Sequence, residues 1–576
     1  MKPFALAVAS GLLMALALPQ AIPWISLAPI DPAGHLELVA WVALVPALFA
    51  LEAARSAGRA FLVGLAAGLA YFYGAIWWVN HAMTSFGGVP LPLALAGLTF
   101  LVLYMALHWA GAFAVSSTIR RRLGWPLWVH FPAVWTGFEL LRNYLFTGFP
   151  WGNLGYTQAR HVTVAQLASL GGVYALAALV VLVNCAVHAA ARARLDRARL
   201  PVRPLVAAAV ALVAALAYGA VHLRGVRARA AAAPRVTIAL VQGNVNQSVK
   251  NEARTHGLYG EDILARYVPL TVEADRRGAD LVAWPEAAYP YLVGARLPSF
   301  AVARSGLPPL ARAHLLLGVA TMDERREEGR RVVEGSNSVF LLGPDLRVSG
   351  RYAKHHLVPF GEYVPGWLAG VLRSVVPQMV RQTPGSELRV LTFPMHPTST
   401  QTPTATATLP PSVRPERSEA ESKGEGDLVR IAPMICFDAI FPEVNVAYAA
   451  QDPELLLNPT NDAWYGYSSG PHQFLAMVQL RAIEAGKAVA RPAYAGVSAI
   501  IDPTGEVRPG ALPVGPVDPA LAPDPDEPAR LLVGEVPRLR GKTLYTTVGD
   551  LFAAAASAFG AVALALALRA GRAPRS

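Results

Sequence analysis

The chain has 576 residues, of which 54% are hydrophobic and only 15% are charged, and its 50 Lys and Arg against 39 Asp and Glu give a net charge of +11. A soluble domain carries about 25% charged residues, so this composition excludes a disordered tail, a coiled coil and a single soluble globule. It points to a membrane protein, in which basic loops beside the spans explain the positive charge without a nucleic-acid partner. With only two cysteines, Cys185 and Cys436, the chain is not a disulfide scaffold.

Apolar stretches recur along the chain at the length of about 20 residues that crosses a bilayer core. The expected spans are about 3–20, 36–54, 60–79, 91–115, 125–141, 163–189, 203–222 and 548–568. The first of them could instead be a cleaved signal peptide, but further spans follow at once and no cleavage site with small residues stands out. The sequence therefore predicts an α-helical membrane bundle of about eight transmembrane helices.

Arginine is unevenly distributed among the short loops between these spans. The loops after the second, fourth and sixth spans are rich in it, whereas the intervening loops hold two at most. The basic residues are Arg55, Arg59, Arg120, Arg121, Arg122, Arg192, Arg194, Arg197, Arg199 and Arg203. Because basic loops stay in the cytoplasm, this alternation places both termini there and the segment between the last two spans outside.

The segment 225–547 has a different pattern. Short β-rich runs such as VTIALVQGN (236–244), ADLVAWPE (279–286) and VRIAPMIC (429–436) alternate with helical stretches. This is an α/β pattern in about 300 residues, enough for a core of its own. Residues 396–427 are rich in Thr, Pro, Ser and charge, a composition that predicts a disordered insertion.

The predicted organisation thus has three parts. Residues 1–224 form a transmembrane domain of seven helices, and residues 225–547 form an extracytoplasmic α/β domain. Residues 548–576 form a C-terminal transmembrane helix with a cytoplasmic tail.

Three residues of the α/β domain suit covalent acyl chemistry. Glu286 ends an apolar strand in LVAWPEAAYP, Lys354 lies in the loop GRYAKHHLVPFGEYVP, and Cys436 stands where the strand VRIAPMIC meets a segment that can begin a helix. A helix N-terminus favours the thiolate, a carboxylate can take the thiol proton, and a lysine can stabilise an oxyanion. Spacing alone leaves this triad a hypothesis.

Each of these residues also has an ordinary structural explanation. A single cysteine is usually a small buried hydrophobe, Glu286 could cap a helix, and Lys354 could be a solvated loop charge. His355 and His356 suggest a metal site, but adjacent histidines face different ways and no third ligand follows at a recognisable spacing. Cys185, in the apolar run VVLVNCAVHAA, is expected to pack within the membrane.

The segments WPE, GRYAKHHLVPFGEYVP and ICFDAIFPE resemble, in that order, the three catalytic segments of the carbon–nitrogen hydrolase (nitrilase) superfamily. This resemblance implies an αββα sandwich in which Glu286 is the base, Lys354 the electrostatic partner and Cys436 the nucleophile. A domain of this kind between seven spans and one is similar to the apolipoprotein N-acyltransferase family. Four further segments resemble that family, namely VQGNVNQSVK (241–250), FPWGNLGYTQ (149–158), NDAWYGYSSGPHQ (461–473) and RAIEAGKAVAR (481–491).

The resemblance implies a two-step reaction at a bacterial inner membrane, without metal or cofactor. Cys436 attacks the ester carbonyl of a phospholipid, Glu286 takes the thiol proton, and Lys354 stabilises the oxyanion together with the backbone N–H of Phe437. The thioester then passes its acyl chain to the α-amine of the diacylglyceryl-cysteine of an apolipoprotein. Two substrates that follow one another through a covalent enzyme imply ping-pong kinetics.

Further residues are expected around this triad. Glu362, in PFGEYVP, is expected to orient Lys354 or the transition state, the alternative being a loop salt bridge. Aromatic rings are favoured at a membrane interface, so aromatic residues near the motifs are expected to bind the lipid substrates. These are Trp464, Tyr465, Tyr363 and Trp367.

Three positions depart from the family pattern. Asn251 stands where Trp usually follows QSVK, Asp438 replaces a Glu after the nucleophile, and Tyr494 stands near the place of an Asn before the Gly-x-Ser/Thr element. These changes leave the triad intact and bear on acyl-chain preference and rate. Two other functions stay open at this point: a membrane-anchored amidase that resolves the acyl-enzyme with water, and a catalytically inactive scaffold or transporter.

Overall fold

The computed structural model describes most of the chain. The described residues are 2–19, 35–245, 250, 259–302, 305–327, 330–359, 361–363, 382–395, 428–466, 468–514 and 528–570. Three subjects of the sequence predictions lie outside them, namely the insertion 396–427, Asn251 and Trp367.

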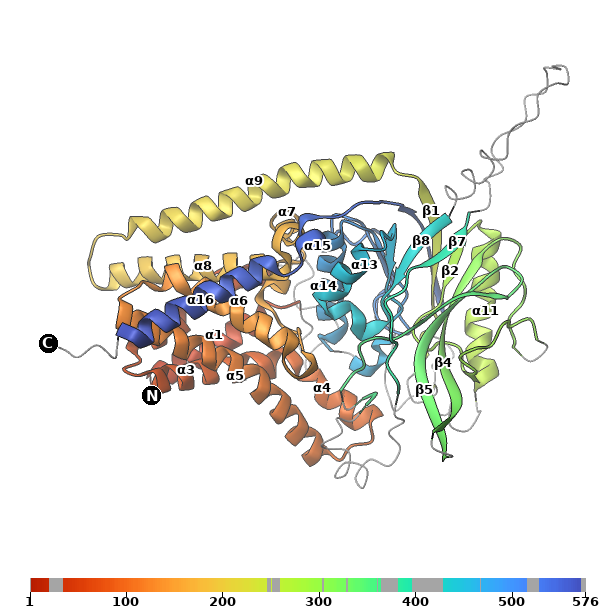
Figure 1. Cartoon of the computed structure of the whole chain (residues 1–576), viewed down its shortest axis with the longest axis horizontal. Helices are drawn as coiled ribbons and strands as arrows, with labels where there is room; N and C mark the ends of the chain where they lie inside the picture. The colour runs from red at the N-terminus through yellow and green to blue at the C-terminus, as the bar shows by residue number, and fades with distance from the viewer. Residues whose placement is uncertain are drawn as a thin grey trace, which may run out of the picture.

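The first part of the chain and its last helix form one helical bundle, coloured red to yellow and dark blue in Figure 1. Its apolar runs fold as helices because a helix satisfies its backbone hydrogen bonds within one segment, as a membrane core requires. The long elements are α1 (Lys2–Leu16), η1 (His35–Trp41), α2 (Val45–Ala53), α3 (Ala57–Ile76), α5 (Leu91–Leu123), α6 (Leu127–Tyr144), α8 (Ala168–Leu195), α9 (Val202–Ala232) and α16 (Leu551–Ala570). The short ones are α4 (Trp78–His81), η2 (Ala82–Phe86), η3 (Leu145–Thr147), η4 (Leu154–Gln158) and α7 (Val162–Ala165).

Six helices of the described part are long and apolar enough to cross a membrane. They are Leu36–Ala53, α3, α5, α8, α9 and α16. The predicted spans 3–20 and 125–141 correspond to α1, which has only 15 residues, and to α6, whose charged residues Glu139 and Arg142 make it less apolar. The prediction of several membrane helices is confirmed, whereas the number eight stays a prediction.

Glycines let the bundle helices approach one another closely. A Cβ on Gly64 of α3 would lie 2.7 Å from the carbonyl oxygen of Trp109 in α5. The last helix packs on α6 in the same way, because a Cβ on Gly137 would lie 3.1 Å from Oγ of Ser557 in α16. Close contacts between small residues hold helices together where lipid removes the hydrophobic drive for association.

Two sheets form the middle of the α/β part. The first has the order β12-β1-β2-β4-β5-β6, with β3 beside β4, and the second has the order β11-β10-β9-β8-β7. In the first sheet the strands are β1 (Arg235–Gln242), β2 (Leu281–Ala283), β3 (Leu292–Val293), β4 (His314–Glu327), β5 (Arg330–Leu342), β6 (Val348–Ala353) and β12 (Arg530–Pro537). In the second they are β7 (Leu391–Pro394), β8 (Leu428–Pro433), β9 (Leu455–Leu457), β10 (Val489–Arg491) and β11 (Ala499–Ile501). The helices of this part are α11 (Gly260–Arg276), η5 (Cys436–Ile440), α13 (Pro442–Ala449), η6 (Asp462–Tyr465), α14 (Gly470–Ala485) and α15 (Leu544–Val548).

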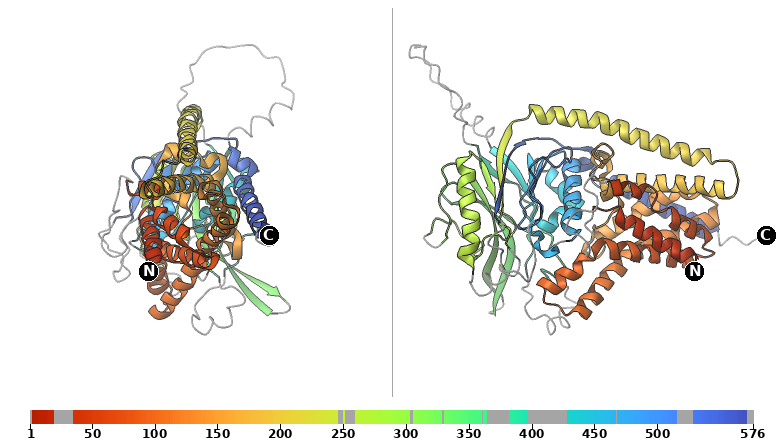
Figure 2. Two further views of the ribbon diagram at one scale, coloured as in Figure 1. Left: turned by 90° about the vertical axis from the view of Figure 1, so that its left-hand side faces the viewer. Right: turned by 180° about the vertical axis from the view of Figure 1, so that it is seen from behind.

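Side chains of β1 alternate between two cores. Val236, Ile238 and Leu240 lie in the apolar cluster shared with the second sheet, while Ala239 and Val241 lie in the cluster shared with α11. Because successive side chains of a strand point to opposite faces, the first sheet is packed between α11 and the second sheet. On its other side the second sheet is covered by α13 and α14 (Figure 2). This is the αββα layer order that the sequence predicted.

The α/β part is seated directly on the bundle through α13 and α14 (Figure 1). Buried hydrogen bonds cross this contact, and two of them involve Glu484 and Gln473 of α14. Glu484 Oε1 of α14 accepts the backbone N–H of Val173 at 3.1 Å, and Trp151 Nε1 donates to Gln473 Oε1 at 2.7 Å. The second sheet, with the strand that leads to Cys436, is therefore the sheet nearer the membrane helices.

Candidate active site

Glu286 follows β2, and both oxygens of its carboxylate accept hydrogen bonds. Its Oε1 accepts Lys354 Nζ at 2.9 Å and Asn337 Nδ2 at 2.5 Å. Its Oε2 accepts the backbone N–H of Asn461 at 2.9 Å. The residue is only 5% exposed, so its orientation is fixed by these three donors.

Lys354 directly follows β6 and is held between two carboxylates. Its Nζ lies 2.9 Å from Glu286 Oε1 and 2.8 Å from Glu362 Oε1. The Glu362 carboxylate also accepts the N–H of Val358 at 2.8 Å, which fixes its own position. Glu362 therefore bonds directly to Lys354 in the site, where it can orient the ammonium.

Cys436 stands at a sharp turn after β8. Its φ is +46°, in a region that a residue with a side chain rarely adopts, and strain of this kind is concentrated at functional sites. The backbone N–H of Cys436 donates to the carbonyl of Pro459 at 2.8 Å, which ties the turn to the strand beside it. The structure thus brings the three predicted residues together from the ends of β2, β6 and β8.

The charges of the site oppose the effect of burial. Burial by itself would raise the pKa of Glu286, but the cations of Lys354 and Lys250 hold that pKa below its usual value. Burial would lower the pKa of Lys354, but the two carboxylates raise it well above its usual value. Burial, and then the negative charge of Glu286, raise the pKa of the Cys436 thiol. The resting site therefore holds a carboxylate, an ammonium and a neutral thiol.

This charge state corrects one expectation. A helix N-terminus was expected to favour the thiolate of Cys436, yet the pKa of the thiol is raised. The chain after Cys436 forms η5, a single short turn of 3-10 helix, and α13 begins only at Pro442. So short a turn supplies little dipole, and it does not offset the burial of the sulfur. A thiol with a raised pKa needs a base before it can act as a nucleophile, and the Glu286 carboxylate lies in the same site.

Asp438 joins the turn at Cys436 to the loop that carries Lys354. Its carboxylate accepts the hydroxyl of Tyr352 at 2.7 Å and the backbone N–H groups of His355 and His356 at 3.2 and 2.7 Å. It also accepts the N–H of Ile435 at 3.0 Å. A carboxylate one carbon shorter than the family's Glu is thus fully bonded at this position.

Replacing Asp438 with alanine is expected to destabilise the protein and lower its activity. The change leaves one buried and two partly buried backbone N–H groups without their acceptor, which costs roughly 3 kcal/mol in total. The midpoint of thermal unfolding of the purified protein and its acyl-transfer rate measure the two effects. The variant Asp345→Ala, at an exposed turn where Asp345 caps the N–H of Arg347, is the control. An unchanged unfolding midpoint in Asp438→Ala would refute the assigned role.

The histidines beside Lys354 have other partners. His355 Nδ1 lies 2.9 Å from the carbonyl oxygen of Gly385, and the ring of His356 stacks on Phe441 at 3.9 Å between centroids. Within the described ranges, no group of three or more His, Cys, Asp or Glu side chains is placed to hold a metal ion.

Two contacts to Glu286, from Asn337 and Lys250, were missed by the sequence predictions. Asn337, in β5, donates from Nδ2 to Glu286 Oε1, and the same Nδ2 lies 3.5 Å from Glu362 Oε1. Lys250 is 3% exposed and donates to the carbonyl oxygen of Glu286 at 3.1 Å. Its ammonium lies 4.2 Å from the ring centre of Tyr494. The departure at Tyr494 therefore places an aromatic face on a cation that helps to keep Glu286 ionised.

The predicted substrate-binding aromatics lie where the α/β part meets the bundle. Tyr465, in η6 like its half-buried neighbour Trp464, packs edge-on against Trp78 with ring centres 4.5 Å apart. Phe437, next to the nucleophile, lies 6.1 Å from Phe149. The hydroxyl of Tyr363 is 3.4 Å from Oγ1 of Thr147 in η3. Trp367 is outside the described residues.

Known proteins resemble both parts of the chain. Residues 10–186 match the family described as the apolipoprotein N-acyltransferase N-terminal domain, and residues 237–513 match the carbon–nitrogen hydrolase family. An apolipoprotein N-acyltransferase of Geobacter metallireducens is 33% identical over 574 residues, which are 99% of this chain and 96% of that protein. Another, from Azotobacter vinelandii, is 32% identical over 485 residues, covering 81% and 79% of the two chains.

Proposed function

Because the chain belongs to the apolipoprotein N-acyltransferase family, we propose that it transfers acyl chains through a thioester on Cys436, with Glu286 as base and Lys354 as oxyanion partner. The chain is an N-acyltransferase of lipoprotein maturation and a multi-pass protein of the bacterial inner membrane. The observation that carries the proposal is the Lys354 ammonium, 2.9 Å from Glu286 Oε1 beside the strained turn of Cys436.

The first step uses a membrane phospholipid as acyl donor. Glu286 takes the proton of the thiol while Sγ of Cys436 attacks the ester carbonyl carbon, and the carbonyl oxygen becomes an oxyanion. Lys354 and the backbone N–H of Phe437 stabilise that charge in a site from which water is excluded. The ester C–O bond then breaks, and the proton held by Glu286 passes to the leaving oxygen. The products are a lysophospholipid and a thioester.

The second step uses the diacylglyceryl-cysteine of an apolipoprotein as acceptor. Its free α-amine attacks the thioester carbon, and Glu286 takes a proton from that nitrogen. The C–S bond breaks, the sulfur recovers a proton, and an amide is formed. The aromatic side chains of Trp464, Tyr465 and Tyr363 line the approach of both lipids from the bundle.

A phospholipid with a labelled sn-1 acyl chain tests this proposal. Incubation with the purified enzyme is expected to attach label to the protein, and neutral hydroxylamine, which cleaves thioesters, is expected to release it. An apolipoprotein acceptor then takes up the label as an amide that resists hydroxylamine. Free fatty acid as the sole product would instead indicate a membrane-anchored hydrolase.

The pH dependence of acyl-enzyme formation distinguishes a base from a free thiolate. Since the pKa of Glu286 is below its usual value, the carboxylate is present at neutral pH and is lost only as the pH falls through that lowered value. The labelling rate is therefore expected to vary by no more than about twofold between pH 6.5 and 8.5. A rate that rises about tenfold per pH unit over this range would mean that a free thiol titrates, and would contradict the assignment.

The membrane arrangement is part of the proposal. Eight spans, with both termini in the cytoplasm, would divide the chain into a membrane domain at 1–224, an extracytoplasmic domain at 225–547 and a last span within 548–576. Two exposed positions test it, Leu292 in β3 and Leu195 at the end of α8. In spheroplasts an impermeant maleimide is expected to label Leu292→Cys at once but Leu195→Cys only after permeabilisation. The reverse pattern would overturn the orientation.

A further inference from the structure

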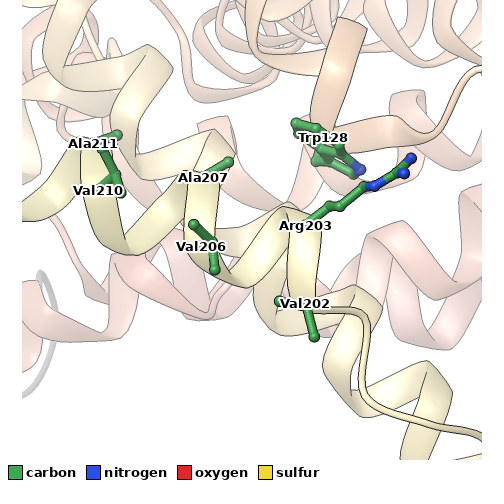
Figure 3. A pocket seen from close by; sticks show the side chains of 7 residues that line it. All are labelled: Trp128, Val202, Arg203, Val206, Ala207, Val210 and Ala211. Carbon is green, nitrogen blue, oxygen red and sulfur yellow. The ribbon is translucent and has the colours of Figure 1, made fainter.

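A groove of about 590 Å³ lies beside the first turns of α9 (Figure 3). Its volume is within the range of about 300–1,000 Å³ that small-molecule sites occupy. One wall is the ring of Trp128 from α6, and the rest belongs to α9. The lining residues are Trp128, Val202, Arg203, Val206, Ala207, Val210 and Ala211.

The groove lies far from Cys436. The loop that joins α8 to α9 is at the end of the bundle furthest from the two sheets, and α9 runs from there back toward β1 (Figure 1). The apolar side chains of α9 in this region are uncovered, with Val206 52% and Val210 62% exposed. In a membrane such a surface is in contact with acyl chains rather than with protein.

Positive charge is concentrated in the chain segment that leads into α9. The segment 192–203 holds five arginines and one aspartate, and Asp196 is already paired with Arg192 at 2.8 Å. Within the described part of the chain, no carboxylate forms an ion pair with Arg203. The guanidinium of Arg203 lies beside the ring of Trp128 at the groove (Figure 3).

We propose that this groove binds an anionic phospholipid, with one acyl chain along the apolar face of α9 and the phosphate against Arg203. A guanidinium matches a phosphate with two parallel hydrogen bonds, and a tryptophan ring is favoured at the level of the headgroups. Basic pockets between membrane helices bind anionic lipids for the same reasons. The lipid is held rather than consumed, and it occupies the groove between the first turns of α9 and Trp128 of α6.

Native mass spectrometry of the full-length enzyme tests this site. The probes are dioleoyl-phosphatidylglycerol, which is anionic, and dioleoyl-phosphatidylcholine, which is zwitterionic and has the same chains. The wild-type enzyme is expected to retain the anionic lipid about fivefold more than the zwitterionic one. Arg203→Glu is expected to remove this preference, while Arg224→Glu, about 30 Å further along α9, is expected to keep it. Equal retention of the two lipids by the wild type, or an unchanged preference in Arg203→Glu, would overturn the proposal.

A second pair of variants tests the binding of the lipid's acyl chain separately from the binding of its headgroup. Ala207→Trp fills the groove without a change of charge and is expected to reduce retention of the anionic lipid about fivefold. Val213→Trp, at a position of α9 that is 64% exposed and outside the groove, is expected to have no effect. The unfolding midpoint of each variant shows whether it is folded. If Ala207→Trp instead splits a dimer of the enzyme, the groove is a contact between two copies and the lipid proposal fails.

Discussion

Replacing Cys436 with serine is expected to abolish the attachment of labelled acyl chain to the protein, by roughly 10³-fold or more. The hydroxyl of serine is far harder to deprotonate than a thiol, and the low pKa of Glu286 makes this carboxylate too weak a base for it. The side chains have nearly the same shape, so the strained turn is retained. Label released by hydroxylamine measures the effect, and the unfolding midpoint shows that the variant is folded.

The second cysteine supplies the control for this experiment. Cys185 is 2% exposed and lies in α8, within the bundle. Cys185→Ala removes a thiol of the same chain without altering the site, and it is expected to label like the wild type. Labelling of Cys436→Ser at the wild-type level, or loss of labelling in a folded Cys185→Ala, would show that the acyl chain is carried elsewhere.

Replacing Lys354 with methionine is expected to lower acyl transfer about 10³-fold at neutral pH. The ammonium lies within 2.9 Å of both Glu286 Oε1 and Glu362 Oε1, so its removal leaves the buried carboxylate of Glu286 near the partly buried carboxylate of Glu362 without a cation between them. Without Lys354 the negative charge nearby opposes the ionisation of Glu286 and raises its pKa. The variant thereby loses both the oxyanion partner and part of the base.

Glu362→Gln is the matched variant for Lys354→Met. It removes one of the two carboxylates but keeps the ion pair between Lys354 and Glu286, so we expect a smaller loss, of about tenfold. The acyl-transfer rates of the two purified variants, compared with their unfolding midpoints, separate chemistry from stability. Transfer by Lys354→Met at more than a tenth of the wild-type rate would remove Lys354 from the mechanism.

The fold was largely predictable because its elements are long and regular. Continuous apolar runs predicted the membrane helices, and the β-rich run 236–244 predicted the strand β1, but not the two cores that its side chains join. The span predicted at 125–141 corresponds to α6, in which Glu139 and Arg142 interrupt the apolar run. Their partners come from elsewhere in the fold: the backbone N–H of Leu154 donates to Glu139 at 2.9 Å, and Arg142 bonds to Asn153. A hydropathy profile does not show that buried charged residues are satisfied by hydrogen bonds from other parts of the fold.

The triad was predictable from the order of its motifs, but its surroundings were not. Asn337 lies in β5, and only the pairing of β5 with β4 and β6 brings it to Glu286. In the sequence, Asn337 is only a polar residue directly before the run SVFLL (338–342). Polar residues at the start of such runs are common in strands, so this position gave no signal of a functional role. The raised pKa of the Cys436 thiol was not predicted, because burial of the sulfur depends on the whole fold.

The contact between α16 and α6 has a consequence for biosynthesis. About 400 residues separate the two helices in the sequence. At roughly 5–20 residues per second, the ribosome needs about 20–80 s to synthesise these intervening residues. During that interval the catalytic part must fold while the face of α6 around Gly137 has no helix against it. A chain that terminates before α16 leaves this face of α6 without a packing partner. Such incomplete chains therefore differ from complete ones in the packing of their membrane part as well as in length.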